Sequence, residues 1–76
     1  MASLIYSFAQ LEAFTAVAEH GSLMKAASKL GKDRTTLRDL IDFLEDGLGY
    51  ALFVREGRNL QLTPEGEQLQ RQAHLL

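Results

Sequence analysis

The sequence predicts a mainly α fold in which three helices form a core, a two-stranded β-ribbon follows, and a further helix ends the chain. Two observations predict this order. Apolar residues recur three and four positions apart through three segments that glycines separate. After Gly49 the apolar period changes to two, which is typical of strands. With 76 residues, the chain has room for one small domain.

Residues 8–20 carry the pattern of the first helix. Ser7 and Gln10 have the spacing of a capping box, which satisfies two free amides at a helix start. Gly21 is expected to end the helix in a left-handed conformation. The expected buried face consists of Phe8, Leu11, Phe14, Val17 and Ala18.

The second helix is expected over residues 23–30. Ser22 suits its N-cap and Gly31 its end. A helix this short is marginal alone and needs its neighbours. Its apolar face consists of Leu23, Ala26, Ala27 and Leu30.

The third helix is expected over about 34–47. Asp33 is the predicted N-cap, and Gly47 and Gly49 are expected to close the helix. The apolar residues are Leu37, Leu40, Ile41, Leu44 and Leu48.

Residues 52–62 are predicted to form the ribbon. Leu52 and Val54, then Leu60 and Leu62, alternate like two short strands around a turn at 56–59. Because an isolated ribbon is barely stable, it must pack on the helices. The residues expected to make this contact are Leu52, Phe53 and Leu62.

A last helix is expected from Pro64 to the end of the chain. Thr63 supplies an N-cap hydroxyl, Pro64 suits the first helical position, and Glu65 places an acid in the first turn. The apolar stripe of this helix consists of Leu62, Leu69, Ala73 and Leu76.

Three helices followed by a β-ribbon is the order of a winged helix-turn-helix. Ala27, Gly31 and Leu37 have the offsets of that motif: a small residue for close crossing, a glycine for the turn, and an apolar anchor. Three common residues are a weak pattern, so a plain helical hairpin remains the alternative at this point.

A longer set of residues makes the assignment specific. The chain resembles the N-terminal DNA-binding domain of LysR-type transcriptional regulators from about residue 8 to its end, without gaps. The matching residues are Leu11, Phe14, Val17, Ala18, Glu19, Gly21, Ser22, Ala26, Ala27, Leu30, Leu37, Ile41, Leu44, Glu45, Leu48, Gly49, Leu52, Phe53, Arg55, Gly57, Arg58, Leu62, Thr63 and Gly66.

The resemblance implies an N-terminal extension (1–7), a winged helix-turn-helix domain (8–63) and the start of a linker helix (64–76). It implies that the third helix enters the major groove of double-stranded DNA and that the wing contacts the adjacent backbone or minor groove. It also implies a homodimer joined through the last helix and a higher oligomer in a longer parent. The effector-sensing domain of that parent is missing here, so this fragment would bind no effector. The dimer candidates are Leu69, Ala73 and Leu76, with packing back onto the same domain as the alternative.

Charge position favours DNA although the net charge is −2. Residues 22–38 carry five cations and one anion, a local net charge of +4. Phosphate contacts are expected from Ser22, Lys29 and Lys32. The alternative for any single lysine is a solvated surface charge. For Lys25, phosphate contact and a solvated surface charge are left as an even choice.

Three residues near the start of the third helix, Arg34, Thr35 and Arg38, should project outward and contact DNA. An arginine there can make a bidentate contact with guanine. The alternative for Arg38 is a weak i,i+4 pair with Asp42.

In the wing, the arginines Arg55 and Arg58 are expected at the minor groove or phosphates. The alternative for Arg55 is that it turns back and pairs with a carboxylate.

The sequence departs from the family pattern in the third helix. Asp39 stands near the position where the family carries an arginine, and Asp42 and Asp46 follow it. These three residues, here called the acidic ridge, would repel phosphates if they faced the duplex. Either the ridge turns away from DNA, or binding is weaker and differently specified, so no target sequence carries over.

Other functions are disfavoured. The absence of cysteine excludes disulfides, cysteine-ligated zinc and a thiol nucleophile. His20 and His74 have no acidic partner at ligand spacing, so we expect neither metal nor cofactor, and no catalysis. With no predicted membrane span or signal peptide, we expect a bacterial cytoplasmic, nucleoid-associated protein. The alternative function is a winged-helix protein-interaction module that has lost DNA binding and uses the acidic ridge.

Overall fold

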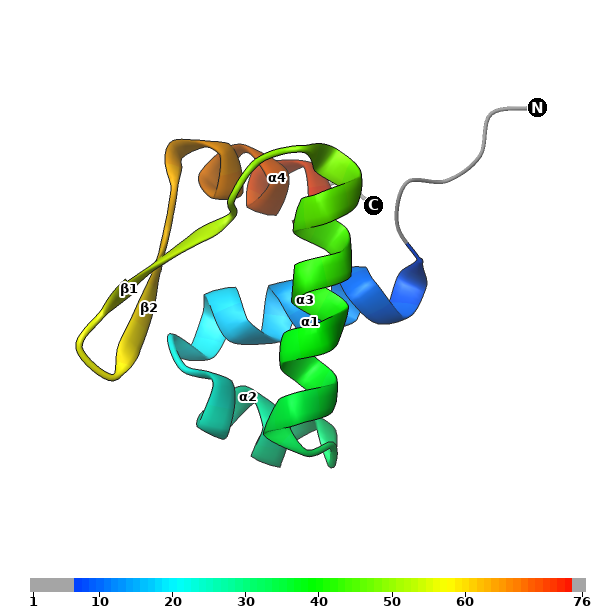
Figure 1. Ribbon diagram of the computed structural model, residues 1–76, viewed down its shortest axis with the longest axis vertical. Helices are drawn as coiled ribbons and strands as arrows, with labels where there is room; N and C mark the ends of the chain where they lie inside the picture. Colours follow the sequence, from blue (N-terminus) through cyan, green and yellow to red (C-terminus); the bar gives the residue numbers. More distant parts are fainter. Residues whose placement is uncertain (1–6, 75–76) are drawn as a thin grey trace.

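The structure, a computed structural model, describes residues 7–74 and has the predicted fold class. In Figure 1, α1 crosses α3, α2 lies near the start of α3, and the ribbon projects to one side. The predicted 1–7 extension lies outside the described residues except for Ser7. The elements are α1 (Phe8–His20), α2 (Leu23–Leu30), α3 (Arg34–Leu48), β1 (Phe53–Glu56), β2 (Asn59–Leu62) and α4 (Pro64–His74).

The predicted capping residues start α1 and α2. Ser7 Oγ accepts from the Gln10 amide at 3.2 Å, and the Ser7 amide donates to Gln10 Oε1 at 3.0 Å, so the capping box is confirmed. Ser22 Oγ accepts from the Lys25 amide at 3.1 Å. Gly21 ends α1 with φ 75°, a backbone conformation that glycine adopts without strain. Local chemistry therefore sets both helix starts.

The start and end of α3 differ in part from the prediction. Asp33 occupies the N-cap position, but its carboxylate accepts no capping hydrogen bond. The pKa of Asp33 lies below its ordinary value, mainly because of its interaction with the Thr36 side chain. Gly49 ends the helix with φ 86°, whereas Gly47 lies inside α3, so the prediction that Gly47 closes the helix was wrong.

The core consists of two clusters that Phe53 joins. One lies among α1, α2 and α3, and the other lies where α1 and α3 meet the ribbon and α4. Phe53 packs against both, and its ring centroid is 5.5 Å from that of Phe14. The buried members are Ala13, Ala16, Val17, Ala26, Ala27, Leu37 and Ile41 in the first cluster, and Phe14, Leu44, Leu52 and Leu69 in the second.

The buried face of α1 is rotated from the predicted one. It includes the small residues Ala13 and Ala16, which allow the helices to approach closely. Phe8, predicted on this face, is 80% exposed. The prediction favoured the large residues of α1, whereas close helix crossing uses its alanines.

The ribbon is antiparallel, and on β1 it is Phe53, not Val54, that faces the core. Phe53 pairs with Leu62 and Val54 with Gln61. Val54 is 50% exposed, so the predicted alternation of Leu52 and Val54 was wrong. Leu52 is fully buried but lies just before β1. The three predicted packing residues, Leu52, Phe53 and Leu62, do contact the core.

Hydrogen bonds from both sides hold the ribbon on the helices. Glu45 Oε2 on α3 accepts from the amides of Leu52 at 2.7 Å and Phe53 at 3.4 Å. The Leu60 amide donates to the Gly21 carbonyl at 2.9 Å. Both strands are therefore fixed relative to α1 and α3.

The start of α4 is tied to the chain before β1. Thr63 Oγ1 accepts from the Gly66 amide at 3.0 Å and donates to the Ala51 carbonyl at 2.8 Å. This confirms the predicted N-cap.

No helix within residues 7–74 is long and apolar enough to cross a membrane.

Replacing Gly66 with alanine should destabilise the domain. A Cβ at Gly66 would overlap the Leu52 carbonyl oxygen and lie 2.9 Å from Leu62 Cδ2. We expect the Gly66→Ala substitution to lower the free energy of unfolding by about 1–3 kcal/mol in urea denaturation. Gly47→Ala, on the exposed side of α3, is the control and should stabilise by about 1 kcal/mol. Equal losses from both variants would contradict the packing described for Gly66.

Removing the Glu45 carboxylate should loosen the ribbon. Glu45→Ala leaves two partly buried amides without their acceptor, and we expect a loss of about 1–3 kcal/mol in unfolding free energy. In this variant, hydrogen exchange of the Leu52 and Phe53 amides should be faster than in the wild type, while exchange of the α1 amides should change less. Glu45→Gln, which keeps an oxygen acceptor, should lose less. Unchanged exchange at Leu52 in Glu45→Ala would rule out this anchor.

Candidate nucleic-acid interface

A cationic groove lies between the start of α2, the start of α3 and the ribbon. Its volume is about 510 Å³. Four of its lining side chains are cationic, and no carboxylate lines it. The lining residues are Ser22, Leu23, Met24, Lys25, Arg34, Arg55, Arg58, Asn59 and Leu60.

The four cations come from separate parts of the fold. Lys25 lies in the first turn of α2, Arg34 begins α3, Arg55 is on β1, and Arg58 is in the ribbon turn. All four side chains are exposed. The groove thus concentrates positive charge in a chain whose net charge is −2. A cleft lined by one sign of charge raises the local concentration of the opposite ion.

Ser22 places a helix N-terminus in the same groove. Its hydroxyl caps α2, and the first amides of a helix attract anions. The groove therefore combines arginine and lysine side chains with backbone donors, a set of groups that binds phosphate.

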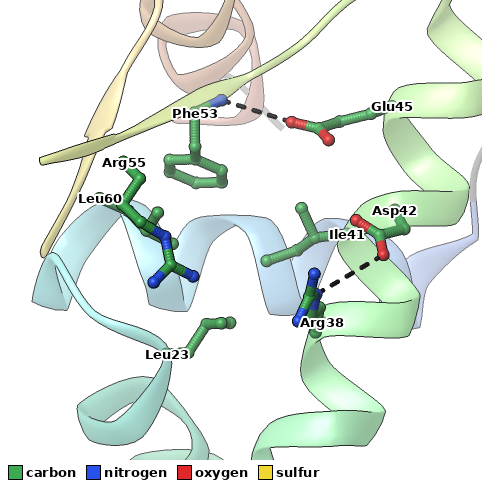
Figure 2. Close-up of a pocket in the computed structure, with 8 residues that line it drawn as sticks. All are labelled: Leu23, Arg38, Ile41, Asp42, Glu45, Phe53, Arg55 and Leu60. Atoms are coloured by element: carbon green, nitrogen blue, oxygen red, sulfur yellow. Dashed lines mark hydrogen bonds and ion pairs between the residues drawn. The ribbon is translucent and has the colours of Figure 1, made fainter. Parts of the chain in front are cut away.

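A second, smaller crevice of about 180 Å³ separates α3 from β1 (Figure 2). Arg38 and Asp42 line it from α3, and Arg55 lines it from β1. Arg38 Nε lies 4.0 Å from Asp42 Oδ2, so the i,i+4 pair that the sequence left open is present. The two side chains are 67% and 59% exposed, so the pair contributes little to stability and leaves Arg38 accessible.

The remaining predicted DNA contacts lie outside the groove. Thr35, Lys29 and Lys32 are exposed but do not line it. Lys29 lies in the last turn of α2, where a cation also favours the helix dipole. The structure thus brings together Ser22, Arg34, Arg55 and Arg58, with Arg38 in the adjoining crevice.

All three residues of the acidic ridge are exposed on α3. Asp39 follows Thr35 by four residues and so shares its stripe of the helix. Asp42 faces the crevice beside Arg38. The acidic ridge is therefore not buried against the domain, and Asp39 and Asp42 lie on the same side of α3 as Thr35 and Arg38, respectively.

Sequence reasoning missed three residues of this region and left a fourth undecided. Lys25, which was left as an even choice, lines the groove, and so do Asn59 and Met24, the latter 64% exposed. Glu45 was noted only as a matching residue, although it positions the ribbon. Spacing on α2 placed Lys25 near Ser22, but the contacts of Asn59 and Glu45 join distant segments and leave no local pattern.

The three dimer candidates have different surroundings. Leu69 is 7% exposed and packs on Phe14, Leu44 and Leu52 of its own domain, which is the alternative that the sequence left open. Ala73 is partly exposed on α4. Leu76 lies outside the described residues.

Comparison with known proteins identifies the family. Residues 8–67 match the model of the bacterial regulatory helix-turn-helix protein, lysR family. A probable hydrogen peroxide-inducible genes activator of Mycobacterium xenopi is 48% identical over 63 residues, which cover 83% of this chain and 33% of that protein. The chain spans between 19% and 33% of the length of this and other curated relatives.

Solved structures with the same fold include DNA complexes of CbnR and BenM. The CbnR DNA-binding domain in complex with DNA is 33% identical, with a TM-score of 0.87, and the match covers 91% of this chain and 79% of that one. The BenM DNA-binding domain in complex with benA site 1 DNA is 38% identical, with a TM-score of 0.82, and the match covers 87% of this chain and 77% of that one. Every residue that lines the groove lies inside the segment that matches the family model. The chain therefore belongs to the lysR family of bacterial regulatory helix-turn-helix proteins.

Proposed function

We propose that this domain binds double-stranded DNA sequence-specifically, with α3 in the major groove and the ribbon on the adjacent backbone or minor groove. The cationic groove carries this proposal, because four cations from three parts of the fold line one concave surface that no carboxylate lines. Likeness to DNA-bound relatives in both sequence and structure adds support.

The residues divide into backbone and base contacts by their position. Ser22, Lys25 and Arg58 line the groove and suit phosphates. Lys29 and Lys32 are exposed outside the groove, and we assign them to phosphates as well. Arg34, Thr35 and Arg38 occupy the first turns of α3, the part of a recognition helix that contacts base edges. Arg55 lies between the two, lining both the groove and the crevice.

The rest of the proposal concerns the parent regulator. Helix α4 begins a linker helix, which joins two copies of the domain so that they meet successive half-sites. An effector-sensing domain belongs to the parent and not to residues 8–63. The domain itself performs no catalysis, and as a bacterial DNA-binding regulator it works in the cytoplasm, at the nucleoid.

Duplex selection from a random library, followed by affinity measurements across salt concentrations, tests the proposal. We expect an enriched sequence whose affinity falls steeply as salt rises, because bound phosphates release counterions. The protein-interaction alternative predicts no enrichment and no duplex binding at moderate ionic strength.

Substitutions in α3 and α2 should separate base contacts from phosphate contacts. Arg34→Ala and Arg38→Ala should each relax the preference at one base pair, at a cost of about 1–3 kcal/mol on the preferred duplex. Lys29→Ala and Lys32→Ala, the matched controls, should weaken all duplexes alike and reduce the salt slope by about one. Selection repeated with each variant measures this. The base assignment fails if neither arginine variant changes the enriched sequence.

A charge on α4 should weaken the dimer. Ala73→Glu places a carboxylate on the proposed seam, and we expect sedimentation equilibrium to show a dimer dissociation constant raised by about tenfold or more, since burying an unpaired charge is costly. Gln72→Glu, which adds the same charge at the neighbouring exposed position, should have a smaller effect. If the wild-type chain stays monomeric with and without duplex, the dimer proposal is wrong.

A further inference from the structure

Two arginines and two carboxylates line the crevice between α3 and β1. Arg38 and Asp42 extend from α3 and Arg55 from β1, as Figure 2 shows. The two guanidinium groups carry the same charge, so on this side Arg55 repels Arg38. A carboxylate beside Arg38 would offset this repulsion and favour one orientation of its guanidinium group.

Asp42 is the carboxylate available for that role. The other carboxylate that lines the crevice is Glu45, whose Oε2 already accepts from the amides of Leu52 and Phe53. Asp42 Oδ2 lies 4.0 Å from Arg38 and, among the residues that the structure describes, Asp42 has no other ion pair.

The atom through which Arg38 meets Asp42 matters for recognition. The contact is made by Nε, which lies on the inner side of the guanidinium group. Both terminal nitrogens are therefore left for other acceptors. Guanine presents two acceptors, O6 and N7, in the major groove, and a bidentate arginine contact needs two donors in a fixed orientation.

We propose that Asp42 is a positioning residue that orients the Arg38 guanidinium for a bidentate contact with guanine, and so sets base preference rather than affinity. This inference rests on the proposed DNA-binding function. Asp42 is an anion on a phosphate-facing helix, so it weakens binding to every duplex, while its hold on Arg38 increases discrimination. Removing the Asp42 charge should therefore raise affinity for every duplex but lower the discrimination between base pairs. Simple repulsion would change the affinity alone.

The test uses Asp42→Asn, which keeps the shape of the side chain and removes its charge. Affinities are measured by fluorescence anisotropy for the selected duplex, for a duplex with the Arg38-dependent G·C pair changed to A·T, and for a random duplex. We expect affinity for the random duplex to rise by about twofold, because one repelling charge is lost. The G·C over A·T ratio should fall by about threefold or more, because Arg38 loses its orientation.

Two further variants make the result specific. Asp46→Asn removes the same charge one helical turn further along α3 and should raise affinity for all duplexes with an unchanged ratio. In an Arg38→Ala background, Asp42→Asn should leave the ratio unchanged, since the side chain that it positions is gone. Asp42→Glu, which keeps the charge, should retain more of the G·C over A·T ratio than Asp42→Asn does. Thermal melting of each variant shows that the fold is intact.

The outcomes distinguish this inference from the function on which it rests. A wild-type chain that binds no duplex overturns both. Duplex binding in which no base preference depends on Arg38, or in which Asp42→Asn raises all affinities equally, overturns only the role of Asp42.

Discussion

The whole binding surface depends on how the ribbon is held against the helices. A two-stranded ribbon has little stability of its own, and here Glu45 fixes its first strand to α3 while the Leu60–Gly21 bond fixes its second strand to the end of α1. Phe53 then packs against both core clusters. Because these contacts set the distance from ribbon to helices, they also create the groove between them.

The charge distribution follows from that geometry. The chain is negative overall, so its net charge does not favour a duplex. Lys25, Arg34, Arg55 and Arg58 come together only because the ribbon folds back beside the starts of α2 and α3. Asp42, which lines the adjoining crevice, is paired with Arg38. Position of charge, rather than its sum, thus decides what the domain can bind.

Features with a local cause could be predicted from the sequence, and features with a distant cause could not. The capping box at Ser7, the N-cap at Ser22 and the left-handed glycine at Gly21 depend on neighbours a few residues away, and all were predicted correctly. The packing of Leu52 and Phe53 was predicted correctly, but the alternation of Leu52 with Val54 was not, because all three residues are apolar and only the pairing of Phe53 with Leu62 decides which side of β1 faces the core. The residues that line the groove also divide into those with a local cause and those with a distant one. Arg34 and Ser22 follow from helix starts, whereas Asn59 lies in the groove only after the ribbon has docked.

The central claim, that the groove is where the duplex lies, is tested most directly by following the backbone amides of the 76-residue chain by NMR during titration with the selected duplex. The account predicts that the largest shift changes fall on residues 22–25, 34–38 and 55–59, with small changes at the middle of α1. Changes centred on α1 or α4 instead, with the groove amides unmoved at saturation, would contradict it.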